Sequence, residues 1–317
     1  MLISMITQRE LARQLGLTQA AVSLALSGRG RVAPATRERV CEAARRLGWQ
    51  ADPALAALSR RRWDAGIGPI AYLGSRVAEE DPRFDQYWLA LRARARSQGV
   101  QVHHVDPRLR GNAADLAAEL DRLGVHGGVL IGQDNRSQVP WQLDWERWAV
   151  VHCGLYVTPG PGDVVCADLL AAPADAVARL AGRGRIAVIL PLTPGSLSEQ
   201  MLFAALHDLA RRDAVALWSG PPVDLDQALP WLQAQDAAQV LGYGDWMAEW
   251  LRRHGVRLPI ACMAISEGRR QRGSCIPFTA IAGQAVELLL AKVAAGERGT
   301  GGGRRIHLVP MPWRERA

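Results

Sequence analysis

The stretch that decides the fold of the N-terminal part is residues 6–59, ITQRELARQLGLTQAAVSLALSGRGRVAPATRERVCEAARRLGWQADPALAALS. Thr7 and Glu10 have the spacing of a helix-capping box, and Gly16 is typical of a helix C-cap. Thr18 is placed to cap a second short helix. Two short helices joined by a tight Gly-Leu-Thr turn predict a helix-turn-helix.

A third helix is predicted over residues 34–47. Pro34 suits the first turn of a helix, Val40 lies on its apolar face, and Gly48 suits its end. The N-terminal part is therefore predicted to be an all-α unit of three helices within residues 1–50.

The positive charge of the chain is gathered at this end. Residues 1–63 carry eleven arginines and four acidic residues, a net charge of +7 that equals the formal charge of the whole chain. The remaining residues therefore balance at zero. GC-rich coding would explain why Lys292 is the only lysine, but it would not explain why the arginines cluster. A basic head on a neutral body indicates a polyanionic partner for the head.

Residues 6–59 resemble, along their whole length, the head of the LacI/GalR family of bacterial transcription repressors. The resemblance rests on the Thr7 cap, the A-x-x-L-G-L-T turn, Ala21-Val22-Ser23, Val32, the T-R-x-R-V run from Thr36, and Leu47-Gly48. It implies a head that binds duplex DNA with its second helix in the major groove.

The resemblance also implies roles for individual residues. Side chains at the start of the second helix would face base edges: Gln19, Ala20 and Ala21. Gln19 can hydrogen-bond an adenine edge, whereas the alanines can only contact thymine methyl groups or avoid clashes. Phosphate contacts are expected from a larger set: Thr7, Thr18, Ser23, Thr36, Arg29 and Arg31. For the two arginines, a solvated loop charge is the alternative interpretation.

A hinge and linker are expected over residues 51–67, because residues 52–58, DPALAAL, match the hinge helix of the same family. Seven residues cannot hold a helix alone in water. The resemblance implies that two hinges pair on DNA, where Leu58 inserts into the minor groove. We group Leu55 with Leu58 as DNA-binding, and the alternative is that both leucines dock on the larger domain.

After residue 68 the sequence changes to short apolar runs that alternate with stretches of helical periodicity. The strands are predicted at 70–73, 100–105, 128–131, 186–190, 214–218, 260–263 and 306–309, with others beginning at Val150, leading into Cys166 and holding Val240-Leu241. The helices are predicted around Phe84–Ala95 and at 113–123, 169–182, 196–212, 225–234, 245–254 and 283–295, and a shorter one holds Trp141, Trp145 and Trp148 as a core face. This alternation predicts parallel sheets in two Rossmann-like lobes.

Residues 68–317 resemble, less closely than the head, the two-lobed periplasmic-binding-protein-like (type I) α/β sensor domain of the same family. The matching pieces are LDWERWAVV, the strand leading into Cys166-Ala167-Asp168, and QAVELLLAKVAAGERG. The resemblance implies a homodimer that binds a small effector, often a sugar, between its lobes.

Eight positions are candidates for effector binding: Tyr72, Arg76, Phe84, Tyr87, Asp168, Ser198, Asp245 and Glu267. Three of them depart from the family pattern, since Ser198 replaces an arginine, Asp245 follows glycine where asparagine is usual, and Glu267 follows serine where aspartate is usual. Sugar sites need convergent hydrogen bonds. Either the effector is not a simple sugar or the protein acts without one. For each candidate, core or surface packing is the alternative.

Other site classes are not favoured. The five cysteines are scattered without a C-x-x-C pair, which predicts buried free thiols and no zinc site. No nucleophile elbow or paired acid/base signature is found, so neither catalysis nor a cofactor is expected. The chain has no apolar run of 18 residues and no secretory signal after Met1, so we expect a cytoplasmic protein.

These features predict a DNA-binding transcription regulator, expected to be a repressor, that binds a palindromic operator as a homodimer and responds to a small-molecule effector. An effector-independent repressor or architectural protein with a vestigial cleft is one alternative. A solute-binding protein or sugar-processing enzyme on the same sensor fold is another. The missing export signal and the basic head argue against that last interpretation.

Overall fold

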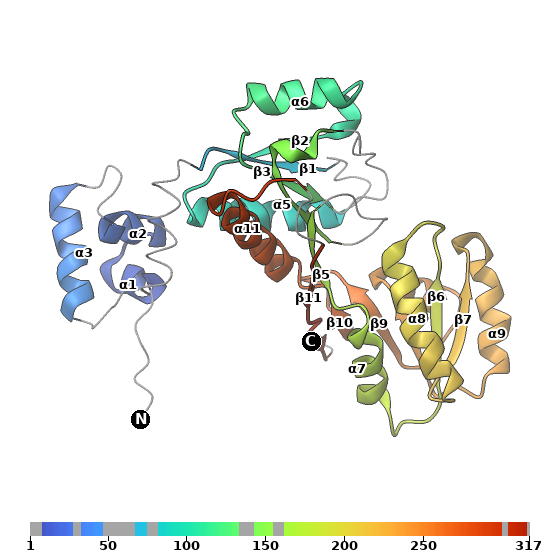
Figure 1. The fold of residues 1–317 in the computed structure, drawn as a ribbon. Helices are drawn as coiled ribbons and strands as arrows, with labels where there is room; N and C mark the ends of the chain where they lie inside the picture. Colours follow the sequence, from blue (N-terminus) through green and yellow to red (C-terminus); the bar gives the residue numbers. More distant parts are fainter. Residues whose placement is uncertain are drawn as a thin grey trace. The chain divides into compact units, whose positions relative to one another are not determined.

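The computed structural model describes residues 8–27, 33–46, 67–74, 82–132, 143–154, 162–299 and 304–315. The chain divides into two compact units, Met1–Gly66 and Ile67–Ala317 (Figure 1). No helix within the described ranges is long and apolar enough to cross a membrane.

The first unit contains three short helices in its described part, namely α1 (Gln8–Leu15), α2 (Gln19–Ser27) and α3 (Pro34–Arg46). They pack against one another around a small core of aliphatic side chains. Leu11, Val22 and Val40 are completely buried there, one from each helix. Val40, which the sequence placed on the apolar face of the third helix, is therefore part of the core of this unit.

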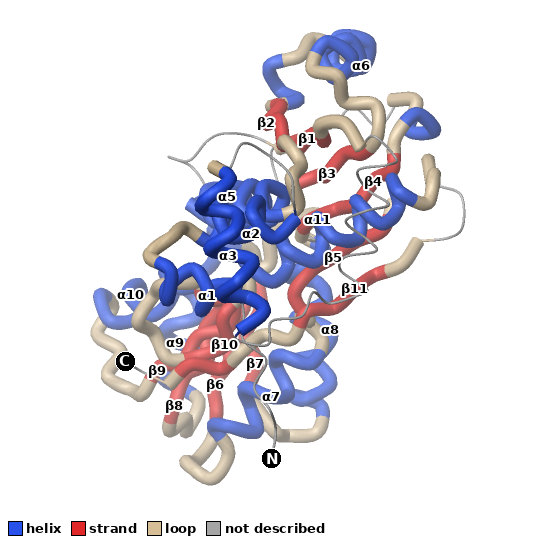
Figure 2. Tube along the Cα trace, turned by 90° about the vertical axis from the view of Figure 1, so that its left-hand side faces the viewer, coloured by secondary structure: helices blue, strands red, loops and turns tan. Residues whose placement is uncertain are grey.

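The described residues of the second unit form two sheets, each of six strands. The first sheet has the order β11-β5-β4-β3-β1-β2, and each neighbouring pair is parallel within the described residues. Its strands, visible side by side in Figure 2, are β1 (Ile70–Leu73), β2 (Val102–Val105), β3 (Gly128–Gly132), β4 (Ala149–Cys153), β5 (Asp163–Ala167) and β11 (Ile306–Val309).

Helices cover both faces of the first sheet, as a buried parallel sheet requires. Along β1, Ile70 and Tyr72 join the core beneath α5 (Pro82–Ser97) and α11 (Phe278–Ala294). Ala71 and Leu73 join a second core with residues of α6 (Ala113–Arg122) and of the 3-10 turn η2 (Trp145–Arg147). Another 3-10 turn, η1 (Pro107–Leu109), follows β2.

The second sheet has the order β12-β10-β9-β8-β6-β7 and is parallel except for the β10–β12 pair. Its strands are β6 (Ile186–Pro191), β7 (Ala216–Gly220), β8 (Gln239–Tyr243), β9 (Ile260–Ile265), β10 (Gly273–Cys275) and β12 (Trp313–Arg314). The helical elements of this lobe are α7 (Ala171–Leu180), α8 (Leu197–Arg211), η3 (Pro222–Gln227), α9 (Ala228–Ala234) and α10 (Asp245–Arg253).

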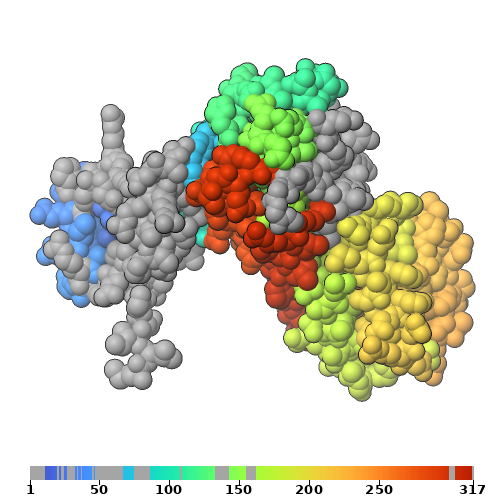
Figure 3. All heavy atoms as spheres, viewed as in Figure 1, coloured from blue at the N-terminus to red at the C-terminus, as the bar shows by residue number. Residues whose placement is uncertain are grey.

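Helix α11 and strand β11 do not stay with the second lobe, although β12 after them belongs to the second sheet. Strand β11 pairs with β5, and α11 packs against β3, β4, β5 and α5. In Figure 3 the red surface of this segment lies beside the green residues of the first lobe. The two-lobed α/β architecture with mostly parallel sheets is confirmed. The order of elements along the chain had suggested two successive sets, and it did not indicate this return.

Three local expectations need correction. Helix α11 begins at Phe278 and not at 283. The prediction missed its first turn because that turn is apolar on several sides and shows no clear periodicity. The expected tryptophan helix is only a 3-10 turn in its described part, since β4 begins at Ala149 directly afterwards. Trp145 and Trp148 are nevertheless core residues, as predicted. Strands β10 and β12 were not predicted, because each is only two or three residues long.

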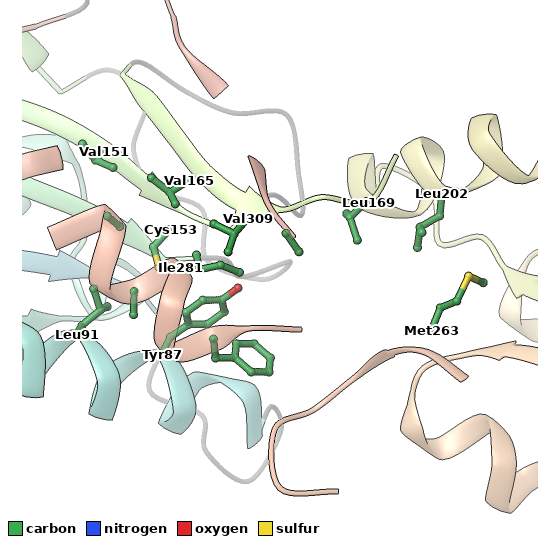
Figure 4. Packing of buried hydrophobic residues seen from close by; sticks show 14 of the residues in the cluster. Tyr87, Leu91, Val151, Cys153, Val165, Leu169, Leu202, Met263, Ile281 and Val309 are labelled. Carbon is green, nitrogen blue, oxygen red and sulfur yellow. The ribbon is translucent and has the colours of Figure 1, made fainter. Parts of the chain in front are cut away.

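The main core of the second unit runs through both lobes. In Figure 4, Tyr87 of α5 lies beside Ile281 of α11, while Leu202 and Met263 belong to the second lobe. All five cysteines are free, and four of them are buried, as predicted. Cys41 is half-buried.

Candidate functional site

The turn between α1 and α2 has the predicted geometry. Gly16 adopts the left-handed conformation with φ +64°, and the Leu17 N–H donates to the Ala12 carbonyl at 3.0 Å. The Ala21 N–H donates to Thr18 Oγ1 at 3.1 Å, so Thr18 caps α2. A glycine C-cap and a threonine N-cap therefore fix this turn at its two ends.

Helix α3 is tied to the end of α1 by a side chain. Arg39 Nη2 donates to the Leu15 carbonyl at 2.9 Å. The last carbonyls of a helix lack partners within the helix, so an arginine can satisfy them and interact well with the helix dipole. The Arg39 side chain is exposed, and its contact joins α3 to the C-terminal end of α1.

The described residues place part of the predicted DNA-contacting set at one helix end. Thr18 and Gln19 are exposed and Ala21 is half-buried at the start of α2, where backbone N–H groups and the helix dipole favour an anion. Thr36 is half-buried in α3. Ala20 and Ser23 belong to α2, but their side chains lie outside the described set. Outside the described residues altogether are Thr7, Arg29, Arg31, Leu55 and Leu58.

The aromatic candidates of the first lobe are buried. Tyr72 is 1% exposed, and its ring is stacked at 6.0 Å on Trp88. Tyr87 is 3% exposed and makes an edge contact at 4.6 Å with Phe278. The geometry favours the packing interpretation for both tyrosines. Phe84 lies in α5 with its side chain outside the described set, and Arg76 lies outside the described residues.

Two candidates lie at the beginnings of helices in the second lobe. Asp168 Oδ1 accepts from the Ala171 N–H at 2.9 Å and from the Leu170 N–H at 3.2 Å, so Asp168 caps α7. Ser198, which was expected to replace an arginine of the family pattern, is buried, and its Oγ lies 3.3 Å from Ser196 Oγ. Neither Asp168 nor Ser198 can act as the long, positively charged hydrogen-bond donor that an arginine would provide.

Asp245 is paired within the protein. It is the first residue of α10, and Arg269 Nε lies 3.2 Å from its Oδ2. Its backbone carbonyl accepts from Gln271 Nε2. Asp245 therefore joins the loop after β9 to the first turn of α10.

Glu267 accepts hydrogen bonds from two helices, α11 and α5. Its Oε2 accepts from Thr279 Oγ1 at 2.9 Å, and its Oε1 accepts from the Thr279 N–H at 3.3 Å. Its carbonyl accepts from Gln86 Nε2 at 3.4 Å. Sequence analysis did not identify Gln86 or Thr279, because Gln86 lies 181 residues from Glu267 and no spacing links them.

The arrangement differs from an open polar binding site. The carboxylates of Asp168, Asp245 and Glu267 all have partners within the chain. A sugar would have to compete with these partners for hydrogen bonds. No group of three or more histidine, cysteine or acidic side chains in the described part of the chain is arranged to hold a metal ion.

The chain matches no protein-family model and no curated protein, but its fold is shared with solved structures. One is the lac repressor bound to ONPG in the repressed state, with a TM-score of 0.56, 18% identity and 99% of both chains covered. Another is the transcriptional regulator CelR with cellobiose, with a TM-score of 0.59, 18% identity, and 98% of this chain and 99% of that chain covered.

A third similar structure covers less of the chain. It is a periplasmic binding protein/LacI transcriptional regulator from Alkaliphilus metalliredigens QYMF complexed with D-xylulofuranose, with a TM-score of 0.55, 14% identity, and 78% of this chain and 97% of that chain covered. The chain therefore shares the overall fold of these solved structures, in which its own two-lobed α/β unit has a counterpart.

Proposed function

We propose that this chain is a DNA-binding transcription regulator of the LacI/GalR type, a repressor and not an enzyme, which binds its operator as a homodimer. The observation that carries the proposal is the likeness to the lac repressor over 99% of both chains, in a chain whose first 63 residues hold its net charge of +7. A solute-binding protein or enzyme would have no use for a basic three-helix head. A DNA partner would also imply a cytoplasmic protein.

We assign a separate role to each of three consecutive parts of the chain. Residues 1–50 would form the helix-turn-helix domain, residues 51–67 the hinge helix and linker, and residues 68–317 the effector-binding and dimerisation domain. In the head, Thr18 and Gln19 are exposed at the N-terminus of α2, where a recognition helix contacts DNA. Gln19 would contact a base edge, and Thr18 and Thr36 would contact phosphates.

The experiment that tests this proposal is selection of binding sites from random duplexes with the full-length chain. The expected product is an inverted repeat with half-sites about one helical turn apart. Gln19→Ala should weaken binding to that duplex about tenfold or more, because one good base contact contributes about 1–3 kcal/mol. Gln233→Ala, an exposed glutamine of α9, is the matched control and should bind like the unaltered chain. Recovery of no repeat would refute the proposal.

The hinge is tested by Leu58→Gly. If Leu58 inserts into the minor groove, this variant should lose affinity for the selected duplex and keep its affinity for random DNA. Unchanged affinity for the selected duplex would exclude the insertion and favour docking of the hinge leucines on the larger domain.

Regulation by a small molecule is part of the proposal, because the similar solved structures are complexes with ONPG, cellobiose and D-xylulofuranose. The internal pairing of Asp168, Asp245 and Glu267 favours a second candidate, a repressor that acts without an effector. A thermal-shift screen of metabolites separates the two. A ligand at 100 times its Kd should stabilise the chain by about 2.7 kcal/mol. Absence of any shift would favour the effector-free repressor.

A further inference from the structure

Helix α11 begins without a cap from its own sequence. Pro277 occupies the N-cap position and provides no side-chain hydrogen bond. The Thr279 N–H, one of the orphan donors of the first turn, donates instead to Glu267 Oε1, and the Thr279 hydroxyl donates to Oε2. A carboxylate at this position also interacts favourably with the helix dipole. Glu267 thus supplies the cap of α11 from a different element.

These contacts join the two lobes. Glu267 follows β9, a strand of the second sheet, whereas the body of α11 packs against β3, β4 and β5 of the first sheet. The chain crosses between the lobes at Ile276-Pro277, just before α11. The Glu267 side chain therefore spans the crossover that a change in lobe arrangement would have to bend.

A second contact reaches Glu267 from α5, which also covers the first sheet. Gln86 Nε2 donates to the Glu267 carbonyl at 3.4 Å. Because a carbonyl can only accept, the hydrogen bond fixes the orientation of the Gln86 amide. The neighbouring Tyr87 ring contacts Phe278, the first residue of α11, at 4.6 Å. The start of α11, α5 and the loop after β9 meet at this point.

The backbone before Glu267 is unusual. Ala264 in β9 has φ +58°, a left-handed conformation rare for a residue with a side chain, and the pairing of β9 with β10 shifts register nearby. A Cβ on Gly273 would lie 1.8 Å from the Cys262 carbonyl oxygen, so only glycine fits there. The surrounding structure therefore holds Ala264 in an unfavourable conformation, three residues before Glu267.

We propose that Glu267, Thr279 and Gln86 form an interlobe clamp, which holds the two lobes in the described arrangement without a bound ligand. In a two-lobed sensor a ligand bridges the lobes and shifts their equilibrium. Here the Glu267 carboxylate, through its hydrogen bonds to Thr279, bridges the two lobes in the way that a ligand would. One consequence rests on the proposed function: with the clamp formed, the chain can bind its operator without a ligand.

The direct test measures the distance between the lobes in the full-length chain. Spin labels are attached at Leu109→Cys in the first lobe and Val223→Cys in the second, both highly exposed positions, in a Cys41→Ser background. The labelled chain is mixed with an excess of unlabelled chain, so that each oligomer contains one labelled copy and the measured distance lies within one chain. The unaltered clamp should give one narrow distance distribution, and Glu267→Ala and Gln86→Ala should each broaden or shift it.

Two variants separate a clamp from general loss of structure. Glu287→Ala removes another α11 carboxylate, which pairs with Arg94 inside the first lobe, and should leave the distribution unchanged. Glu267→Gln keeps one oxygen acceptor for Thr279 and should give an intermediate result. A narrow, unshifted distribution for Glu267→Ala would overturn the proposal, as would equal broadening by Glu287→Ala.

DNA binding gives a separate readout. Glu267→Ala should weaken ligand-free operator binding about tenfold, within the range usual for coupled sites, and Glu287→Ala should not. Failure of the unaltered chain to bind any duplex would refute the proposed function and leave the clamp to be judged by the distances. Normal DNA binding by Glu267→Ala, despite a broadened distribution, would overturn the link between clamp and operator.

Discussion

Lys292 Nζ lies 3.0 Å from Asp163 Oδ2, and the two side chains are only 10% and 3% exposed. Lys292 belongs to the last turn of α11, and Asp163 is the first residue of β5. Asp163 Oδ1 also accepts from the Arg305 N–H at 3.0 Å, next to β11. Glu297 Oε2 lies 3.0 Å from Lys292 Nζ. The only lysine of the chain thus joins its C-terminal segment to the first lobe.

Replacing Lys292 by methionine should destabilise the second unit by about 3–5 kcal/mol, because it leaves Asp163 buried without its cation. The matched control is Arg253→Met, which removes an exposed pair with Glu249 on α10 and should cost less than about 0.5 kcal/mol. Urea unfolding followed by far-UV circular dichroism measures both. Equal, small losses would show that the buried pair contributes no more than a surface pair.

Acid should weaken the same contact. Burial opposes ionisation of Asp163, but hydrogen bonds from Lys292 and the Arg305 N–H, with the lysine charge, hold its pKa below the ordinary value. A lowered folded-state pKa stabilises the fold above the unfolded-state value of about 3.9. This stabilisation is lost as the pH falls through the lower folded-state value. Asp163→Asn should therefore show a flatter decline in stability below about pH 4. Parallel declines would contradict this assignment.

The connection between Lys292 and Asp163 shows what the sequence could and could not predict. Alternating apolar runs predicted nearly all strands, because buried parallel strands are apolar along their length. They could not show that α11 and β11 return to the first lobe. The apolar pattern of a helix or strand is the same whichever of the two sheets it joins. The pairing partner of Lys292 lies 129 residues away and leaves no local signal.

Most thiols should be unreactive in the folded chain. Burial raises the pKa of Cys166 to about 11 and that of Cys262 to about 12, and it also raises the pKa of Cys153 and of Cys275. With Ellman's reagent at about pH 8, only the half-buried Cys41 should react quickly, since the thiolate is the reactive form. Cys41→Ser should abolish the fast phase, and urea should expose the other four. A fast phase that persists in Cys41→Ser would contradict the buried arrangement.

The cap of α2 gives a prediction for the head. Thr18→Ala should destabilise α2 by about 1 kcal/mol, and Thr18→Ser should retain the cap. Amide hydrogen exchange should show faster exchange at Ala21, whose N–H loses its acceptor, in the alanine variant only. Equal protection of the Ala21 amide in both variants would mean that the Thr18 hydroxyl does not support the helix in solution.

The candidate site was less predictable than the fold. The capping roles of Thr18 and Gly16 follow from local chemistry, and both were predicted correctly. The partners of Asp245 and Glu267 come from other elements, so position in a family pattern could not show that these carboxylates are occupied. Local hydrogen-bonding geometry is encoded nearby in the sequence, whereas the pairing of a carboxylate depends on tertiary contacts.

The proposed function requires the basic N-terminal unit to recognise a particular DNA sequence and not only the charge of DNA. The most direct measurement is the ratio of the Kd for a scrambled duplex to the Kd for the selected inverted repeat, with the full-length chain at about 0.15 M salt. A sequence-specific regulator should show a ratio of about 10³ or more. A ratio near one, with both affinities falling equally as salt is added, would mean that the arginines bind DNA only as a polyanion.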